Sequence, residues 1–480
     1  MRARPQARRW QVLSAVCAGV FLAAIDFYIV SVAVPDMLRD FSHTGIAEIS
    51  WVFNGYTITF TTALLPAGGL ADRFGRRRIF LIGVAAFSVS ALACATAPTA
   101  AVLIGARLVQ GLAGGTITPL ALALILPQFP AERRGYAIGL WSATQSAAVA
   151  AGPSLGGILV SAVGWRAVFL LQLPIGLIAL TGTAWLVPRD QTPTGHTAAG
   201  HTAPDQTATN PGGGRPLDLY GVLLLAPGIA LPSLAIVQSH AWGVLNWRTD
   251  VTLIAGLLLA AAFVRRSLRH PAPIVDLRLL GIPAVRRASV VMLLTGLVMY
   301  ALTAAAVLFL TGVWGYSEAR AGLAVTPGPV MQAVAALGGG RLCGRYGPRA
   351  VAVAGAIGLA ASTLAFTVAA GAHSRYWAVI FPAVLGSGAA VGLLVTSLSA
   401  AALREVPAGQ LASGAAISGV ARAVGAVVSL SALALALAAV PDGTGSVHAY
   451  RLAWTAMAVI ACTVLVSSWT LGKPPGNPVI

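Results

Sequence analysis

Apolar stretches, separated by short polar segments, occupy most of the 480-residue chain. Blocks such as 12–34, 101–126 and 289–311 reach the roughly 20 residues that an α-helix needs to cross a bilayer. Helices of a soluble protein carry a polar face, but these blocks are apolar all round. We therefore predict an all-α integral membrane protein. The expected spans are 12–34, 48–67, 79–97, 101–126, 136–160, 167–187, 219–238, 250–264, 288–312, 321–340, 350–371, 376–402, 411–440 and 450–471.

Charged residues make up only 9% of the chain, and their distribution sets the expected orientation. If the amino terminus is cytoplasmic, most of the 31 basic residues fall in cytoplasmic segments, as the positive-inside rule requires. The net charge of +17 is then explained by topology, and no nucleic-acid partner is expected. We predict a multi-pass protein of a bacterial cell membrane with both termini in the cytoplasm. The basic residues expected outside are Arg39, Arg166, Arg248, Arg320, Arg375 and Arg451.

One long polar segment interrupts the apolar pattern. Residues 188–216 are rich in Thr, Gly, Pro and His, a composition that cannot form a packed core, so we predict a flexible cytoplasmic linker there. Its histidines His196 and His201 lie in a low-complexity repeat. The four cysteines are scattered without metal-ligand spacing. No metal site is therefore expected.

A glycine-rich and charged string, GGLADRFGRRR at 68–78, lies between the second and third expected spans. Its glycines permit a tight turn at the membrane surface, and Asp72 can pair with the arginines that follow it. A weaker copy returns at 340–347, where Gly344 replaces the acid. An internal repeat at half-chain spacing is typical of transporters built from two bundles. The residues of the first string that form the candidate loop motif are Gly68, Asp72, Arg73, Gly75 and Arg76.

The string resembles the G-x-L-x-D-R-x-G-R-R signature of the major facilitator superfamily. Residues 25–35 resemble the first-helix motif of its fourteen-helix drug:proton antiporter branch, with Tyr28 and Ser31 in place of the usual Thr and Asn. Segments 164–176 and 273–279 are also similar to that branch. The resemblance implies two six-helix bundles with two extra helices between them. The implied units are an amino-terminal bundle at 1–187, the linker at 188–218, two additional helices with a cytoplasmic loop at 219–287 and a carboxy-terminal bundle at 288–480.

The fifth expected span carries a pattern of glycines with one proline. Small residues that recur every four positions form a face for close helix packing, and Pro153 removes a backbone hydrogen bond and bends the helix. The pattern resembles the superfamily motif that marks antiporters rather than symporters, so the resemblance implies a gating role. Ordinary small-residue packing is the alternative. The residues of the pattern are Gly139, Gly152, Pro153, Gly156 and Gly157.

Asp26 is the only acid well inside an expected span. A carboxylate at that depth costs at least about 2.5–3.5 kcal/mol to insert, so a functional role is the default hypothesis. Arg107 lies at a similar depth, in a sequence RLVQG that resembles the superfamily's R-x-x-Q-G motif, and pairing of the two is geometrically feasible. We predict that Asp26 and Arg107 couple transport to protons. A purely structural ion pair is the alternative.

These patterns favour proton-coupled efflux of lipophilic or cationic drugs, or of a toxic metabolite, by alternating access. A substrate:proton symporter and a membrane sensor without transport are the alternatives. An enzyme is not expected, because the sequence lacks intramembrane clusters of catalytic side chains. We expect a monomer in the lipid bilayer that binds protons and a small molecule, without a cofactor. The candidates for the substrate cavity are Phe27, Tyr28, Trp141, Gln145 and Tyr300.

Overall fold

The computed structural model describes residues 5–41, 44, 46–49, 51–188, 219–243, 246–270, 273, 276–369, 371, 374–407, 410–438 and 447–471, and every regular element in them is helical. The long helices are α1 (Pro5–Ser31), α4 (Trp51–Phe74), α5 (Arg76–Ala95), α6 (Ala100–Ile125), α7 (Ala131–Val163), α9 (Gln172–Leu186), α10 (Leu219–Trp242), α11 (Trp247–Arg269), α12 (Pro283–Gly312), α14 (Pro327–Ala369), α15 (Phe381–Arg404), α16 (Leu411–Ala438) and α17 (Val447–Trp469). The short elements are α2 (Val34–Asp40), α3 (Ile46–Ile49), η1 (Leu126–Gln128), α8 (Arg166–Leu170), η2 (Leu277–Gly281), α13 (Glu318–Val325) and η3 (Tyr376–Ile380).

Each expected span coincides with a helix, although the breaks between helices differ from the expected ones. The sixth span is divided into α8 and α9, which meet at Leu171. The tenth span begins in α13 and continues into α14, which also contains the eleventh span and is kinked at Gly347. The predicted linker falls almost entirely on residues 189–218, which lie outside the described residues.

The glycine-rich string at 68–78 is mostly helical, whereas the sequence led us to expect a loop. α4 continues to Phe74, and only Gly75 leaves the helical conformation, with φ 97°. The second copy has the same geometry, because α14 is kinked at Gly347, where φ is 81°. Glycine adopts a positive φ at little cost because it lacks a Cβ atom. One glycine in each copy therefore makes the turn, and the earlier glycines serve as helix residues.

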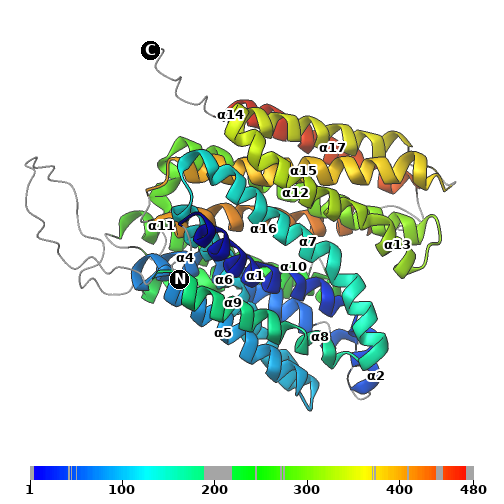
Figure 1. Cartoon of the computed structure of the whole chain (residues 1–480). Coiled ribbons are helices and arrows are strands. Elements are labelled where there is room, and N and C mark those ends of the chain that lie inside the picture. The colour runs from blue at the N-terminus through cyan, green and yellow to red at the C-terminus, as the bar shows by residue number, and fades with distance from the viewer. Residues whose placement is uncertain are drawn as a thin grey trace, which may run out of the picture.

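Two halves make up the helical body (Figure 1). In the amino-terminal half (α1 to α9), α1 packs against α7 and α9, and α6 packs against α4 and α5. In the carboxy-terminal half (α12 to α17), α14 packs against α15 and α17, and α12 packs against α16. The halves meet mainly where α7 contacts α14 and α4 contacts α16. α10 and α11 pack together, and α10 also lies against α4.

Close backbone approaches between the halves occur near one end of the molecule. A Cβ atom added to Gly135 of α7 would lie 2.8 Å from the Gly340 carbonyl oxygen of α14. One added to Gly68 of α4 would lie 3.0 Å from the Ala412 carbonyl oxygen of α16. We call this end the basic end, and Figure 1 shows the two halves diverging away from it. The arginines that define the basic end are Arg73, Arg76, Arg77, Arg78, Arg133, Arg134, Arg341 and Arg345.

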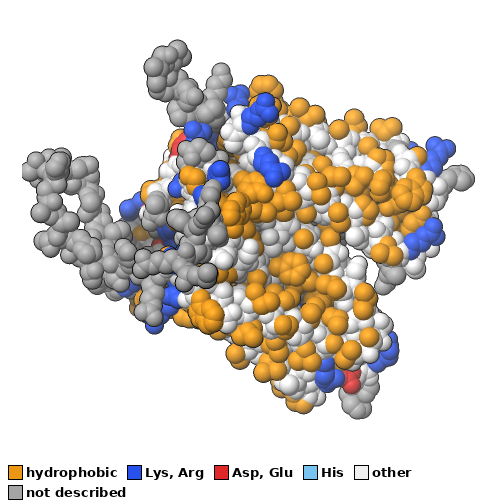
Figure 2. Space-filling model, in the orientation of Figure 1, with side chains coloured by type: hydrophobic (Ala, Val, Ile, Leu, Met, Phe, Trp, Pro, Cys, Tyr) orange, Lys and Arg blue, Asp and Glu red, His pale blue; other side chains and the backbone are white. Residues whose placement is uncertain are grey.

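The lateral surface is apolar. Figure 2 shows hydrophobic side chains along the body, with Lys and Arg gathered towards its two ends. Large exposed hydrophobic side chains include Trp185, which is 84% exposed, and Trp377, which is 75% exposed. Among the described residues, nine helices are long and apolar enough to cross a membrane, or ten if the bent α7 counts as one span. An apolar surface of this extent fits contact with lipid.

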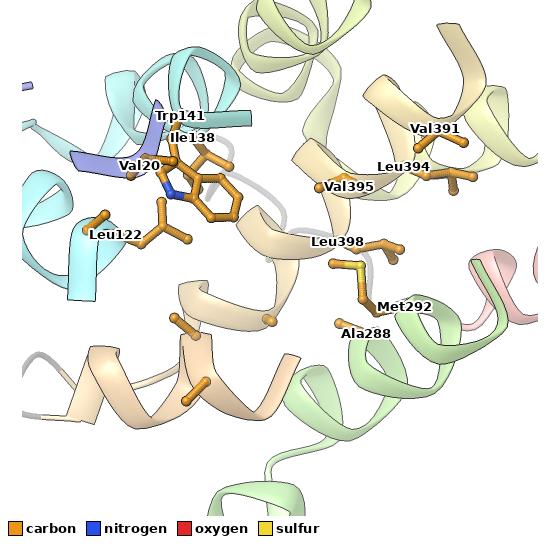
Figure 3. Close-up of a cluster of buried hydrophobic side chains, with 14 of the residues drawn as sticks. Val20, Leu122, Ile138, Trp141, Ala288, Met292, Val391, Leu394, Val395 and Leu398 are labelled. Carbon is orange, nitrogen blue, oxygen red and sulfur yellow. The ribbon is translucent and has the colours of Figure 1, made fainter. Parts of the chain in front are cut away.

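A shared hydrophobic cluster joins the two halves between these ends. Figure 3 shows Val20, Leu122 and Trp141 of the amino-terminal half on one side. Met292 and Leu398 of the carboxy-terminal half lie opposite them. Inside a bilayer such contacts are stabilised by van der Waals packing, because lipid tails are as apolar as the side chains themselves. The halves therefore meet through a packed core near the basic end.

Candidate functional site

Asp26 and Arg107 form a fully buried ion pair between α1 and α6. The Arg107 Nη1 atom lies 2.8 Å from Asp26 Oδ1 and 2.6 Å from Oδ2, and both side chains are 0% exposed. Arg107 Nε also donates a hydrogen bond of 2.9 Å to the Val52 carbonyl oxygen of α4. Two charges withdrawn from solvent need such additional hydrogen bonds to offset their desolvation.

Two glutamines close a ring of hydrogen bonds around the ion pair. Arg107 Nη1 donates to Gln110 Oε1 at 2.8 Å, and Gln110 Nε2 donates to Gln172 Oε1 at 2.7 Å. Gln172 Nε2 completes the ring by donating to Asp26 Oδ1 at 2.8 Å. All four side chains are fully buried. Because the ring joins α1, α6 and α9, a change of charge at Asp26 alters the contacts of three helices.

The aromatic ring of Tyr56 covers the Arg107 guanidinium. The guanidinium carbon lies 4.2 Å from the ring centroid, a cation–π geometry that stabilises a desolvated cation. Close packing of α6 on α4 brings Tyr56 within reach of Arg107. A Cβ atom on Gly111 would lie only 3.0 Å from the Tyr56 Cα atom. Arg107 Nη2 has no hydrogen-bond partner among the described residues. The site therefore retains one unused donor beside its ion pair.

The sequence singled out two of the four residues in this ring. Asp26 and Arg107 were selected for their charge, and the structure brings them into contact. Gln110 belongs to the RLVQG string, but we had assigned it no role, and Gln172 was missed. Gln172 could have been found in the sequence as an amide inside the apolar stretch 167–187, where an amide without a hydrogen-bond partner would be costly.

Two glycines in the second half of α7 pack against α1. A Cβ atom on Gly152 would lie 2.6 Å from the Tyr28 Cβ atom, and one on Gly156 would lie 2.8 Å from the Ile29 carbonyl oxygen. α7 is bent by 41° at Pro153, as the proline led us to expect. The two glycines therefore let α7 lie close to the helix that carries Asp26.

The other two glycines of the α7 pattern have different surroundings. Gly139 faces the carboxy-terminal half, where a Cβ atom would lie 2.5 Å from the Ala336 carbonyl oxygen of α14. Beside Gly157 a Cβ atom would meet nothing within 4 Å among the described residues. The pattern thus combines one contact between the halves, two contacts within a half, and one open position.

Asp72 links the two halves at the basic end. Its Oδ1 atom accepts hydrogen bonds from Arg76 Nε and Nη2 at 3.2 and 3.1 Å. Its Oδ2 atom accepts from Ser413 Oγ at 2.7 Å and from the Ser413 backbone N–H at 3.3 Å. Ser413 lies in the first turn of α16, where the helix dipole favours a carboxylate. Arg73 has a different neighbour, the ring of Phe74, at 5.5 Å from its centroid. The contact with α16 was not expected from the sequence.

A cavity lies between the two halves, with walls from α4, α6, α7, α12, α15 and α16. Trp141, one of the five candidates for the substrate cavity, lines it. Tyr300, another candidate, accepts a hydrogen bond of 3.0 Å from Arg422 Nη1, and Arg422 lines the cavity. Tyr28 interacts electrostatically with both Tyr300 and Arg422. Three of the five candidates therefore gather in this region.

The remaining two candidates are placed differently. Phe27 is 39% exposed, and its ring packs edge-on against the rings of Tyr28 and Phe53, at centroid distances of 5.3 and 6.4 Å. Gln145 is half-buried on α7, one turn beyond Trp141. Neither is part of the cavity wall. Arg422, which does line the cavity, had been assigned no role from the sequence, although an arginine inside an apolar span is a visible signal.

Two helical halves around a central cavity, an apolar lateral surface and a buried ionic ring define a polytopic membrane protein of the transporter type. The family model of the Major Facilitator Superfamily matches residues 16–430, and the chain belongs to this family. Members of the family act on small molecules in the membrane, so the protein is a transporter rather than an enzyme.

Bacterial relatives carry the names of resistance and efflux proteins. The tetracenomycin C resistance and export protein of Streptomyces glaucescens is 32% identical over 362 residues, which cover 75% of this chain and 63% of the relative. A multidrug resistance protein B homolog of Mycobacterium tuberculosis is 30% identical over 418 residues, which cover 87% and 74%. The methylenomycin A resistance protein of Streptomyces coelicolor is 28% identical over 467 residues, which cover 96% and 92%. These relatives are consistent with the fourteen-helix drug-efflux branch.

A solved structure supports the fold. The human organic anion transporter MFSD10 superimposes with a TM-score of 0.64 over 96% of this chain and 99% of its own. The two sequences are 14% identical. At this identity the likeness concerns the arrangement of the helices alone.

Proposed function

We propose that the protein is a proton-coupled antiporter that exports lipophilic small molecules by alternating access. The observation that carries the proposal is the buried Asp26–Arg107 pair with its ring of amides. A carboxylate inside a membrane protein is costly unless it has a function, and it is a group that can gain and lose a proton as its surroundings change. The names of the relatives, which refer to export and resistance, support the direction of transport.

The proposed orientation places the basic end in the cytoplasm, in accord with the positive-inside rule. The bonds of Asp72 to Arg76 and Ser413 then stabilise contact between the halves on the cytoplasmic side. Breaking these bonds would let the cavity open inwards to load substrate. Both halves would rock about the cavity as a pair of rigid bodies, the usual motion of such transporters.

The proposed coupling step is protonation of Asp26 from the outer side. Protonation neutralises the carboxylate, so Arg107 loses its counter-ion and Gln172 loses a charged acceptor. A proton can shift the balance between two conformations only if it binds one of them better than the other. The buried pair supports such a difference, because the charged form of Asp26 is stabilised only while the ring is intact.

The energy of one proton suffices for useful accumulation. A proton that crosses about 100 mV releases about 2.3 kcal/mol. That energy supports a roughly fiftyfold concentration ratio of a neutral substrate, since each 1.4 kcal/mol corresponds to a factor of ten.

Transport into inverted membrane vesicles tests this function. A panel of neutral, cationic and anionic aromatic compounds is offered with and without a proton gradient, and an uncoupler serves as the control. We expect the wild-type protein to accumulate at least one compound only when the gradient is present. The Asp26→Asn variant should still exchange that compound down its gradient but should not accumulate it. Accumulation by the Asn variant with unchanged pH dependence would refute the role of Asp26.

A further inference from the structure

The cavity between the halves has an apolar wall and a positively charged one. Leu64, Leu122 and Met292 supply part of the apolar wall. Arg422 of α16 supplies the charge, and its side chain is half-buried. The cavity is small in this conformation, about 30 Å³, so a ligand would enter it as the halves separate. Its lining suits a lipophilic molecule with a polar group at one edge, because apolar walls and a few placed polar groups are the usual composition of a ligand site.

Arg422 differs from a structural arginine in having no acidic partner among the described residues. Its one hydrogen bond is the 3.0 Å contact from Nη1 to the Tyr300 hydroxyl, and none of the ion pairs in the described part of the chain includes it. Asp26, the acid inside the membrane, is fully buried and already paired with Arg107. The cavity therefore has a cation without a compensating carboxylate among the described residues.

Two further polar groups of the cavity wall have no partner. Trp141 is 6% exposed and Ser418 is 5% exposed, and both line the cavity with Arg422. The Trp141 indole Nε1 and the Ser418 hydroxyl form no hydrogen bond within the residues that the structure describes. An indole N–H can only donate, a guanidinium can only donate, and a hydroxyl can donate. Buried donors without acceptors are costly, so a ligand that brings acceptor oxygens would satisfy them.

We propose that the cavity binds lipophilic organic anions, such as aromatic carboxylates, with the acid group held by Arg422 and supported by Trp141 and Ser418. This narrows the substrate class of the proposed exporter, and it rests on that function for its biological meaning. A cationic drug would meet Arg422 as a like charge in a site of low dielectric constant, which disfavours binding. The guanidinium also offers planar, paired donors that match a carboxylate.

An anionic substrate has a consequence for the driving force. An exported anion exchanged for one inward proton moves two charges in the same electrical sense, whereas an exported cation would move none. An inside-negative membrane potential alone should therefore drive export of the anion, at up to about fiftyfold per charge for 100 mV. The electrical response separates the two substrate classes without any variant.

Binding to the purified full-length protein in detergent tests the site. Three probes share one ring system: 2-naphthoate, its neutral methyl ester and the cationic 2-naphthylmethylammonium. We expect isothermal titration to show 2-naphthoate binding at least about tenfold more tightly than the cation. Equal or tighter binding of the cation, or no binding of 2-naphthoate at millimolar concentration, would overturn the proposal.

Variants then locate the site. Arg422→Gln should weaken 2-naphthoate binding about tenfold or more while leaving the methyl ester within about twofold, and Arg422→Lys should recover part of the loss. Trp141→Phe and Ser418→Ala should each weaken binding by a few fold. Arg320→Gln, an exposed arginine near the opposite end, is the matched control and should bind as wild type. Unchanged 2-naphthoate affinity in Arg422→Gln would contradict the assignment.

Binding and transport fail independently. If 2-naphthoate binds through Arg422 but no probe is exported by a proton gradient, the inference stands and the proposed antiport fails. If a proton gradient drives export of the cationic probe in preference to 2-naphthoate, the antiport stands and the inference fails.

Discussion

The two intramembrane arginines of this transporter have opposite surroundings. Arg107 in the amino-terminal half is 0% exposed, pairs with Asp26, and lies in a closed ring of hydrogen bonds. Arg422 in the carboxy-terminal half is half-buried, lines the central cavity, and is bonded to the neutral Tyr300. The same residue type therefore lies in two different environments in the two halves. A compensated charge suits a switch between protonation states, and an uncompensated charge suits recognition of a ligand.

The repeated string shows the same division between the halves. In the first copy, Asp72 bonds to Ser413 of the opposite half. In the second copy Gly344 replaces the acid. Arg341 contacts the opposite half instead, because its guanidinium carbon lies 4.9 Å from the ring centroid of Tyr136 on α7. The two turns are alike at Gly75 and Gly347, but the charges around them differ. The repeat thus preserves backbone geometry while its side chains diverge.

The largest predicted effect concerns stability at the two arginines. Asp26→Ala leaves Arg107 as a buried charge without a counter-ion, so we expect a loss of about 3–5 kcal/mol in the free energy of unfolding. Tyr300→Phe removes one neutral partner of Arg422, so the loss should be about 1 kcal/mol or less. Thermal or denaturant unfolding of the purified variants measures both.

A double variant provides the control for that comparison. Asp26→Asn combined with Arg107→Gln removes both charges and should be more stable than Asp26→Ala alone, because no unpaired charge remains. Similar losses from Asp26→Ala and Tyr300→Phe would show that the two arginines are not differently compensated.

The next effect concerns the glycines of α7. Gly152→Leu places a side chain where a Cβ atom would already lie 2.6 Å from the Tyr28 Cβ atom, so we expect it to separate α7 from α1 and abolish transport. Gly157→Leu enters open space and should transport at near the wild-type rate. Vesicle transport, normalised to the amount of inserted protein, distinguishes the two. Equal activity of both variants would reduce the pattern to ordinary packing.

A smaller effect is expected at the basic end. Asp72→Asn removes the charge that accepts bonds from Ser413 and Arg76, at a cost of about 1–2 kcal/mol. Amide hydrogen exchange in the first turn of α16 should therefore rise about fivefold or more. Arg341→Gln, in the second copy, should raise it less, because its contact with Tyr136 is a cation–π contact worth about 1 kcal/mol. Equal hydrogen exchange in both variants would contradict the claim that the first copy of the string makes the stronger contact between the halves.

The smallest predicted effect depends on pH. Asp40 accepts hydrogen bonds from Arg166 and Trp165, and these bonds hold the pKa of its carboxyl below its usual value. A lowered pKa in the folded state stabilises the protein above the unfolded pKa of about 3.9, and this stabilisation is lost as the pH falls through the folded value. Asp40→Asn should cost less than about 1 kcal/mol at pH 7, because the pair is exposed. The difference from wild type should vanish in acid. A stability difference between wild type and Asp40→Asn that does not change with pH would show that it does not come from the lowered pKa of Asp40.

Much of the fold was predictable because its signals are strong and local. Long apolar stretches marked the helices, and Pro153 marked the bend of α7. The break at Leu171 was not predictable, because α8 and α9 are both apolar and only their packing separates them. The helical state of residues 68–74 was also missed, because glycine is compatible with both a turn and a tightly packed helix.

The charged residues of the candidate site were predictable from the sequence, but the polar residues that bond to them were not. Asp26 and Arg107 stand out because charge inside a membrane is rare. Gln172 and Ser413 are polar residues of ordinary types, and only the tertiary structure shows that they meet carboxylates. Arg422 is as visible in the sequence as Arg107, yet the role that we propose for it depends on there being no acid near it among the described residues, which sequence alone cannot reveal.

Proton movement coupled to substrate movement tests the central claim most directly. Proteoliposomes that contain the purified protein and a pH-sensitive dye are given a transported compound without an imposed pH gradient. In the wild type, we expect substrate flow to drive protons in the opposite direction. In Asp26→Asn, substrate should flow down its gradient without a proton signal. An Asn variant that moves as many protons per substrate as the wild type would contradict the account.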